Sequence, residues 1–106
     1  MMDATTLILA VTTVANAEQA DRLVALVLRQ RLAACVSLQP LRSHYVWNGE
    51  QHCDDEIQVL FKTTSRQVEL LRDCVLSQHP YDLPEWLCWS AEASPAYATW
   101  ASAQIS

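Results

Sequence analysis

The pattern of apolar and polar positions changes period several times along the chain, and each change predicts a new element. The apolar run Thr6–Thr13 is short and rich in β-forming residues, which predicts a buried strand. Apolar residues then recur at three- and four-residue spacing, which predicts an amphipathic helix near residues 17–31. Asn16 can cap this helix, and Gln19 completes a capping-box pattern three residues later.

A long hairpin is predicted in the middle of the chain. Asn48-Gly49 lies between two extended runs, and both residues tolerate the positive φ that a type I′ turn requires. Two antiparallel strands are therefore expected near residues 33–48 and 51–64. Pro40 is expected to mark a bulge or kink in the first of them.

Helical spacing returns in residues 64–79. Thr64 and Gln67 form a second capping-box pattern at the start of this segment, and Pro80 is expected to end the helix.

The last third of the chain completes the predicted topology. A fourth strand is expected over residues 83–92, followed by a short terminal helix with Ser94 as N-cap and Pro95 as its first residue. The order is strand-helix-strand-strand-helix-strand plus a tail helix. This order predicts an α+β, ferredoxin-like βαββαβ fold with a long central hairpin, built as one domain over residues 1–106.

The predicted sheet carries more apolar side chains than two helices can bury. They are Tyr45, Trp47, Ile57, Val59, Leu60 and Phe61 on the hairpin, with Trp86, Trp89 and Trp100 beyond it. Exposed apolar strips and strand edges are usually protected by pairing with another subunit. A homo-oligomer built by strand pairing is therefore expected.

Composition removes several classes of function. A formal charge of −5 with only seven basic residues argues against nucleic-acid binding, and one glycine excludes a glycine-rich phosphate loop. No stretch has the length of a membrane span and Met1–Asp3 begin without a basic segment, so we expect a cytoplasmic protein with no membrane partner. The four cysteines form no CxxC pair and are expected to be buried or free thiols, and no nucleophile-base pair with a recognisable spacing indicates an enzyme.

The chain resembles the CutA family, the divalent-cation tolerance proteins, from about residue 7 to residue 100. The resemblance is carried by five motifs in order: "LAACVSL" at 32–38, "SHYVWNGE" at 43–50, "DEIQVLFKTT" at 55–64, "HPYDLPE" at 79–85 and "YATW" at 97–100. It implies a ferredoxin-like homotrimer without enzymatic activity, in which the long hairpins pair with neighbouring subunits. It also implies a role in tolerance of divalent metals, with copper as a possible ligand.

The copper ligands implied by the resemblance are poorly matched here. Family members linked to copper have a cysteine at the end of the first strand and two histidines before Pro-Tyr, and these positions are Thr12, Gln78 and His79 in this chain. Copper prefers thiolate or several imidazole donors, so the remaining histidine predicts weak binding at most. The alternative role for His79 is a cationic cap on the carbonyl end of the second helix.

A second candidate site is an inter-subunit cleft. We expect Lys62, Tyr81 and Glu85 to meet there beside His79, with Trp47 at the same boundary. Such residues fit either structural pairing across the trimer or a pocket for a small metabolite or anion. The second possibility is the alternative function, a regulatory module like the PII nitrogen-signalling proteins, although their glycine-rich loops are missing here.

The acidic cluster on the hairpin is expected to have no specific role. Glu50, Asp54, Asp55 and Glu56 lack the alternating oxygen ligands and the glycine of an EF-hand loop. They are therefore predicted to form a solvated end of the hairpin.

Overall fold

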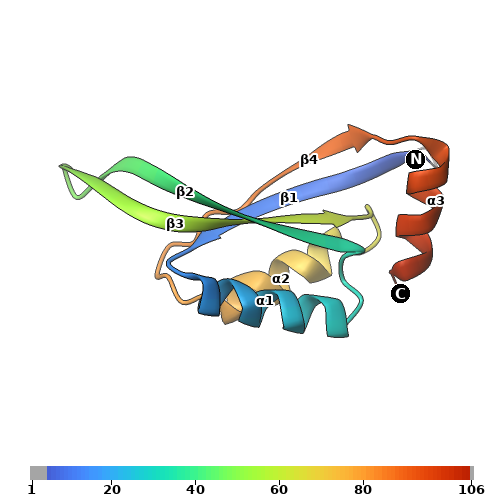
Figure 1. Cartoon of the computed structure of the whole chain (residues 1–106), viewed down its shortest axis with the longest axis horizontal. Helices are drawn as coiled ribbons and strands as arrows, with labels where there is room; N and C mark the ends of the chain where they lie inside the picture. The colour runs from blue at the N-terminus through green and yellow to red at the C-terminus, as the bar shows by residue number, and fades with distance from the viewer. Residues whose placement is uncertain (1–4, 106) are drawn as a thin grey trace.

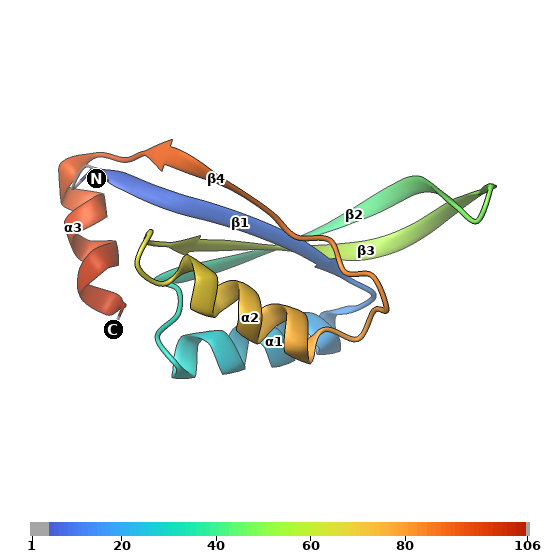
Figure 2. The same cartoon turned by 180° about the vertical axis from the view of Figure 1, so that it is seen from behind.

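A four-stranded antiparallel sheet with two helices on one face forms the body of the computed structural model, which describes residues 5–105 (Figures 1 and 2). The elements in chain order are β1 Thr6–Val14, α1 Ala17–Arg29, β2 Cys35–Trp47, β3 Glu50–Thr63, α2 Val68–Gln78, β4 Leu87–Glu92 and α3 Pro95–Gln104. The strand order β2-β3-β1-β4 confirms the predicted ferredoxin-like βαββαβ arrangement with a terminal helix. Met1–Asp3, on which the expected lack of a secretion signal rests, lie outside the described residues.

The shape of the molecule is elongated, because β2 and β3 continue well past the helices as a two-stranded arm. Figure 1 shows this arm at one end of the sheet and α3 at the other. The principal extents are 45 × 24 × 21 Å. No helix within residues 5–105 has the length and apolar character needed to cross a membrane.

The start of α1 follows the predicted capping pattern. The Asn16 side chain accepts a hydrogen bond from the backbone N–H of Gln19 at 2.9 Å. In return, the Gln19 amide oxygen accepts from the backbone N–H of Ala15, one residue before the cap, also at 2.9 Å. These bonds satisfy donors that the first turn of a helix leaves unpaired, which fixes where β1 passes into α1.

The hairpin turn is the predicted one, but Pro40 does not interrupt the strand. Asn48 has φ 52° and Gly49 has φ 77°, as a type I′ turn requires. Pairing of β2 with β3 runs without an inserted residue from Cys35 opposite Lys62 to Trp47 opposite Glu50, through Pro40 itself. The predicted bulge is therefore wrong. Pro40 is accommodated because β2 is an edge strand of the described sheet.

The second helix begins later than the sequence indicated. It starts at Val68, with Gln67 as N-cap, and the cap side chain makes no capping hydrogen bond. The carbonyl oxygen of Thr64 instead accepts backbone bonds from Gln67 and Val68, which makes residues 64–67 a turn. The capping box expected at Thr64 is thus wrong, whereas the end before Pro80 is confirmed.

The core lies between the sheet and the two helices. Its members are Ala10, Val14, Ala20, Leu23, Val27, Leu32, Ala33, Val59, Phe61, Leu71 and Val75. Val59 and Phe61 are fully buried, so they are not part of an uncovered strip as the sequence suggested. The exposed aromatic residues are Tyr45, Trp47, Trp89, Tyr97 and Trp100.

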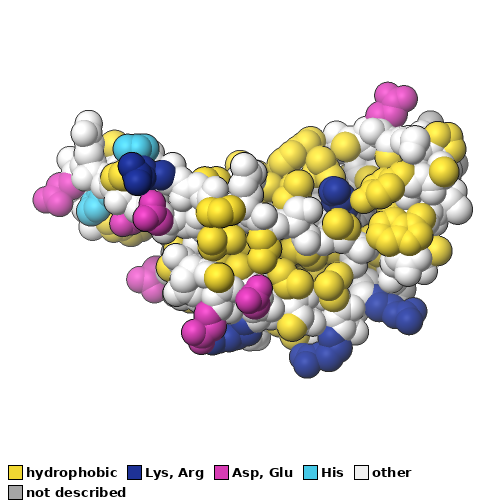
Figure 3. All heavy atoms as spheres, viewed as in Figure 1, with side chains coloured by type: hydrophobic (Ala, Val, Ile, Leu, Met, Phe, Trp, Pro, Cys, Tyr) yellow, Lys and Arg dark blue, Asp and Glu magenta, His cyan; other side chains and the backbone are white. Residues whose placement is uncertain are grey.

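Within residues 5–105, α1 and α2 leave the opposite face of the sheet uncovered, and apolar side chains line much of it. Register places Leu9 next to Trp89 of β4, and Val11 lies between Leu60 of β3 and Leu87 of β4. Trp89 is 46% exposed and Leu87 is 57% exposed. Figure 3 shows hydrophobic side chains gathered over the sheet and near α3, away from the charged tip of the arm.

Candidate functional site: an acidic cleft beside the arm

The segment between α2 and β4, residues 79–85, is tied to the end of β1. The Thr12 hydroxyl donates to the carbonyl oxygen of Glu85 at 2.6 Å. His79 reaches the same part of β1 from the end of α2. Pro80 forces His79 into an extended conformation with ψ 136°, which ends the helix and turns the chain toward the sheet.

The hydrogen bonds of His79 define its protonation. Its Nδ1 atom accepts from the backbone N–H of Tyr81 at 3.1 Å, so this nitrogen carries no proton. Its Nε2 atom lies 2.9 Å from the carbonyl oxygen of Thr13 and 3.0 Å from the Thr12 hydroxyl, and it donates its proton there. Burial lowers the pKa of His79 below 6.5, against smaller opposing effects of the Thr13 bond and of Glu56.

This neutral ring therefore differs from the cationic helix cap that was one expectation for His79. The side chain is directed to β1 and not to the last carbonyl groups of α2. That expectation is wrong, because the bond from Tyr81 requires an unprotonated Nδ1.

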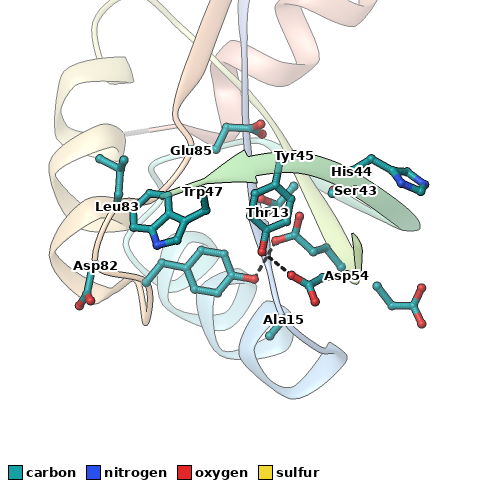
Figure 4. Close-up of a pocket in the computed structure, with 13 residues that line it drawn as sticks. Thr13, Ala15, Ser43, His44, Tyr45, Trp47, Asp54, Asp82, Leu83 and Glu85 are labelled. Carbon is teal, nitrogen blue, oxygen red and sulfur yellow. Dashed lines mark hydrogen bonds between the residues drawn. The ribbon is translucent and has the colours of Figure 1, made fainter. Parts of the chain in front are cut away.

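A cleft of about 830 Å³ opens between this segment and the arm (Figure 4). Trp47 and Tyr45 line it from the arm, and Tyr81, Leu83 and Glu85 line it from the 79–85 segment. The structure thus brings together three of the four residues predicted for an inter-subunit cleft, namely Trp47, Tyr81 and Glu85.

Lys62 is the exception. It lies opposite Leu9 on β1, whereas the cleft is lined at Thr13, roughly 13 Å further along the strand. Its Nζ atom is 5.7 Å from the centre of the Tyr97 ring of α3, a cation–π contact. Within one chain Lys62 therefore lies away from Glu85, and their meeting across a subunit boundary stays a prediction.

Carboxylates give the cleft its electrostatic character. Tyr81 donates to Glu56 at 2.7 Å, and Tyr45 donates to Asp54. Burial, together with the Glu56 bond, raises the pKa of Tyr81, so its phenol stays a donor. Burial and the nearby Glu56 also raise the pKa of Glu85.

Some acidic residues of the arm therefore contact other side chains, whereas the sequence predicted that all of them form a solvated end of the hairpin. That prediction needs correction for Asp54 and Glu56, which the two tyrosines hold against the cleft. Among residues 5–105, the carboxylates that line the cleft are Asp54, Asp55, Glu56, Asp82 and Glu85, and no Lys or Arg of this range lines it. Sequence reasoning missed these tyrosine-carboxylate pairs. The hairpin register, which places Ser43 opposite Asp54, could have indicated the Tyr45 contact.

Only two of the three positions that the family resemblance implies for copper lie next to each other. Thr12 lies against His79, whereas Gln78 is exposed at the end of α2. Residues 5–105 contain no group of three or more His, Cys, Asp or Glu side chains arranged to hold a metal ion. Both nitrogens of His79 are already engaged within the protein.

Comparison with known proteins connects this sequence and fold to a family. Residues 8–104 match the model of the CutA1 divalent ion tolerance protein. This chain belongs to the CutA1 family. Its CutA1 relatives include the divalent-cation tolerance protein CutA of Pectobacterium atrosepticum, 39% identical over 81% of this chain and 80% of that protein. The corresponding protein of Salmonella newport is 38% identical over 81% of this chain and 76% of its own length.

Solved CutA structures have the same fold along the whole chain. The CutA structure from Synechococcus elongatus superposes with a TM-score of 0.92 at 38% identity, covering 99% of this chain and 95% of that one. CutA1 from Oryza sativa gives 0.91 at 29% identity, covering 98% of both chains. The long arm and the terminal helix are therefore CutA1 features.

Acidification is expected to weaken the fold through His79. The unfolded chain binds a proton near pH 6.5, whereas folded His79 binds it only at lower pH. Between these two pKa values the unfolded state holds more protons, so the free energy of unfolding rises with pH and reaches its full value above about pH 6.5. Urea unfolding at a series of pH values measures this slope.

The matched control is His79→Gln, which removes the titrating group and should flatten the slope in this window. Glu85 acts in the opposite direction, because its raised pKa makes stability fall as pH rises above 4.5. Glu85→Gln separates the two contributions. An unchanged slope in His79→Gln contradicts the assignment.

Proposed function

We propose that this CutA1 protein is a non-enzymatic homotrimer that acts in divalent-cation tolerance in the cytoplasm. The family match over residues 8–104 carries the proposal. The relatives from Pectobacterium atrosepticum and Salmonella newport are named divalent-cation tolerance proteins. Four free cysteines support a reducing compartment.

The surface supports assembly. Leu87 and Trp89 are exposed on the sheet face without helices, and such apolar patches mark interaction sites. The outer edges of β2 and β4 have no partner strand within residues 5–105. Pairing of these edges between three copies would protect both, and it would place the cleft around Trp47, Tyr81 and Glu85 at a subunit boundary.

The charge of the cleft supports cations as its ligands. Five carboxylates line it without a Lys or Arg, so its potential favours a cation and repels the metabolite anion of the alternative regulatory function. Copper or another divalent ion is the ligand class we propose. Copper ligation by His79 remains a prediction, and it would require the ring to give up a bond to Thr13 or Tyr81.

A growth experiment tests the tolerance role. Deleting the gene in its own organism is expected to slow growth in elevated Cu²⁺, and a plasmid copy is expected to restore it. A copy with His79→Ala should restore growth as well, because both ring nitrogens are engaged within the protein.

Two controls make the result specific. An empty plasmid must fail to restore growth, and the abundance of the His79→Ala protein must match the wild type. Equal copper tolerance with and without the gene contradicts the proposed function. Failure of His79→Ala at equal abundance contradicts the expectation that His79 is dispensable for tolerance.

A further inference from the structure

A thiol and an imidazole meet on the arm, on the face of the hairpin opposite to Tyr45 and Trp47, and His44 is also among the residues that line the cleft. Cys53 of β3 and His44 of β2 are directly opposite in the antiparallel register. The Cys53 Sγ atom lies 3.7 Å from His44 Nε2, and both residues are exposed. Figure 4 shows the His44 imidazole directed away from Tyr45 and Trp47, and Figure 3 shows histidine side chains at the surface of the arm.

These two donors fit one class of metal ion. A thiolate is a soft ligand that selects Cu⁺, and imidazole also suits copper. Zinc takes four ligands in structural sites, and residues 5–105 contain no cluster of three or more donors. A monovalent d¹⁰ ion such as Cu⁺ differs in that it accepts two donors in a near-linear arrangement.

We propose that Cys53 and His44 bind one Cu⁺ ion per chain. Bonds as long as those of zinc, roughly 2.3 Å to sulfur and 2.0 Å to nitrogen, would place the two donor atoms about 4.3 Å apart when the ion lies on the line between them, and a two-coordinate Cu⁺ ion needs somewhat less. The observed separation is 3.7 Å. A side-chain rotation that moves the two donor atoms apart by about half an ångström would admit the ion while the backbone pairing of the two residues is kept.

The neighbouring side chains limit the site to these two donors. Asp55 follows Cys53 on the same face of β3, but it is paired with Arg42 at 3.4 Å. His52 points to the other face, where its ring stacks on Tyr45 with 5.3 Å between centres. The carboxylate adds negative charge near the ion, whereas His52 does not reach it.

This site differs from the one in the proposed divalent-cation role, because it takes a monovalent ion and depends on Cys53, which does not line the cleft. Cu⁺ is titrated anaerobically into the full chain against a chromophoric Cu⁺ chelator, with thiolate-to-copper absorption as a second signal. We expect one competing equivalent per chain in the wild type. Cys53→Ser is expected to abolish it, and His44→Gln is expected to weaken it at least tenfold.

The matched controls are Cys88→Ser, which removes another exposed thiol, and His52→Gln, which removes the other imidazole of the arm. Both should bind as the wild type does. The proposal is overturned if the wild type does not compete, if Cys53→Ser still competes, or if His44→Gln binds unchanged. Circular dichroism of each variant checks that the fold is kept. Growth in Cu²⁺ is measured in a separate experiment, so a failure of Cu⁺ binding at Cys53 and His44 does not decide the proposed tolerance role.

Discussion

Replacing Phe61 with alanine is expected to lower the free energy of unfolding by about 3–5 kcal/mol. Phe61 is fully buried and belongs to the cluster between the sheet and the helices. Its ring also lies 6.2 Å from the ring of Trp86, which comes just before β4. Truncation therefore leaves a cavity where β3 meets both helices and removes a contact that positions the last strand.

Chemical denaturation at constant pH measures this effect. Leu83→Ala is the control, because Leu83 is 70% exposed and its truncation should change stability by less than about 0.5 kcal/mol. Phe61→Leu should fall between the two, since it keeps much of the buried volume. A loss below about 1 kcal/mol for Phe61→Ala would contradict the assigned core.

Replacing Leu87 with glutamate is expected to convert the proposed trimer into an 11.9 kDa monomer. Leu87 lies beside Val11 on the sheet face without helices, where a partner copy would bury it. A buried, unpaired carboxylate costs several kcal/mol, and each of three symmetric interfaces would carry one. Sedimentation equilibrium at micromolar concentration gives the mass.

Leu70→Glu is the matched control, because Leu70 on α2 is also 57% exposed. It introduces the same charge on the other side of the molecule, where no contact with a partner is proposed, so its mass should equal that of the wild type. A trimer for Leu87→Glu would place the interface elsewhere. A wild-type monomer would refute the assembly itself.

Most of the fold was predictable because its signals are local. Asn48-Gly49 can form a type I′ turn with little help from the rest of the chain, and Asn16 with Gln19 fixes the start of α1 through bonds within one turn. The errors arose where tertiary context decides. Thr64 has the capping pattern, yet a turn there precedes α2, and Pro40 is tolerated without a bulge because its strand is at an edge.

The site was harder to predict, because its contacts join distant segments. Tyr81 and Glu85 were expected near Trp47, and the structure places all three around one cleft. Within the chain, Lys62 lies outside this cleft and contacts the Tyr97 ring of α3, a contact between distant segments that the sequence does not indicate. The Tyr81–Glu56 bond has no sequence signal, since it depends on how the 79–85 segment crosses the end of β1.

The pairing of β1 with β4 also has a consequence during synthesis. The hairpin pairs residues close in sequence, whereas Thr6 of β1 pairs with Glu92 of β4, almost the whole chain away. As the chain leaves the ribosome, β1 to β3 emerge long before β4. One edge of β1 therefore stays unpaired until synthesis is nearly complete, and during this time it can pair with a strand of another chain.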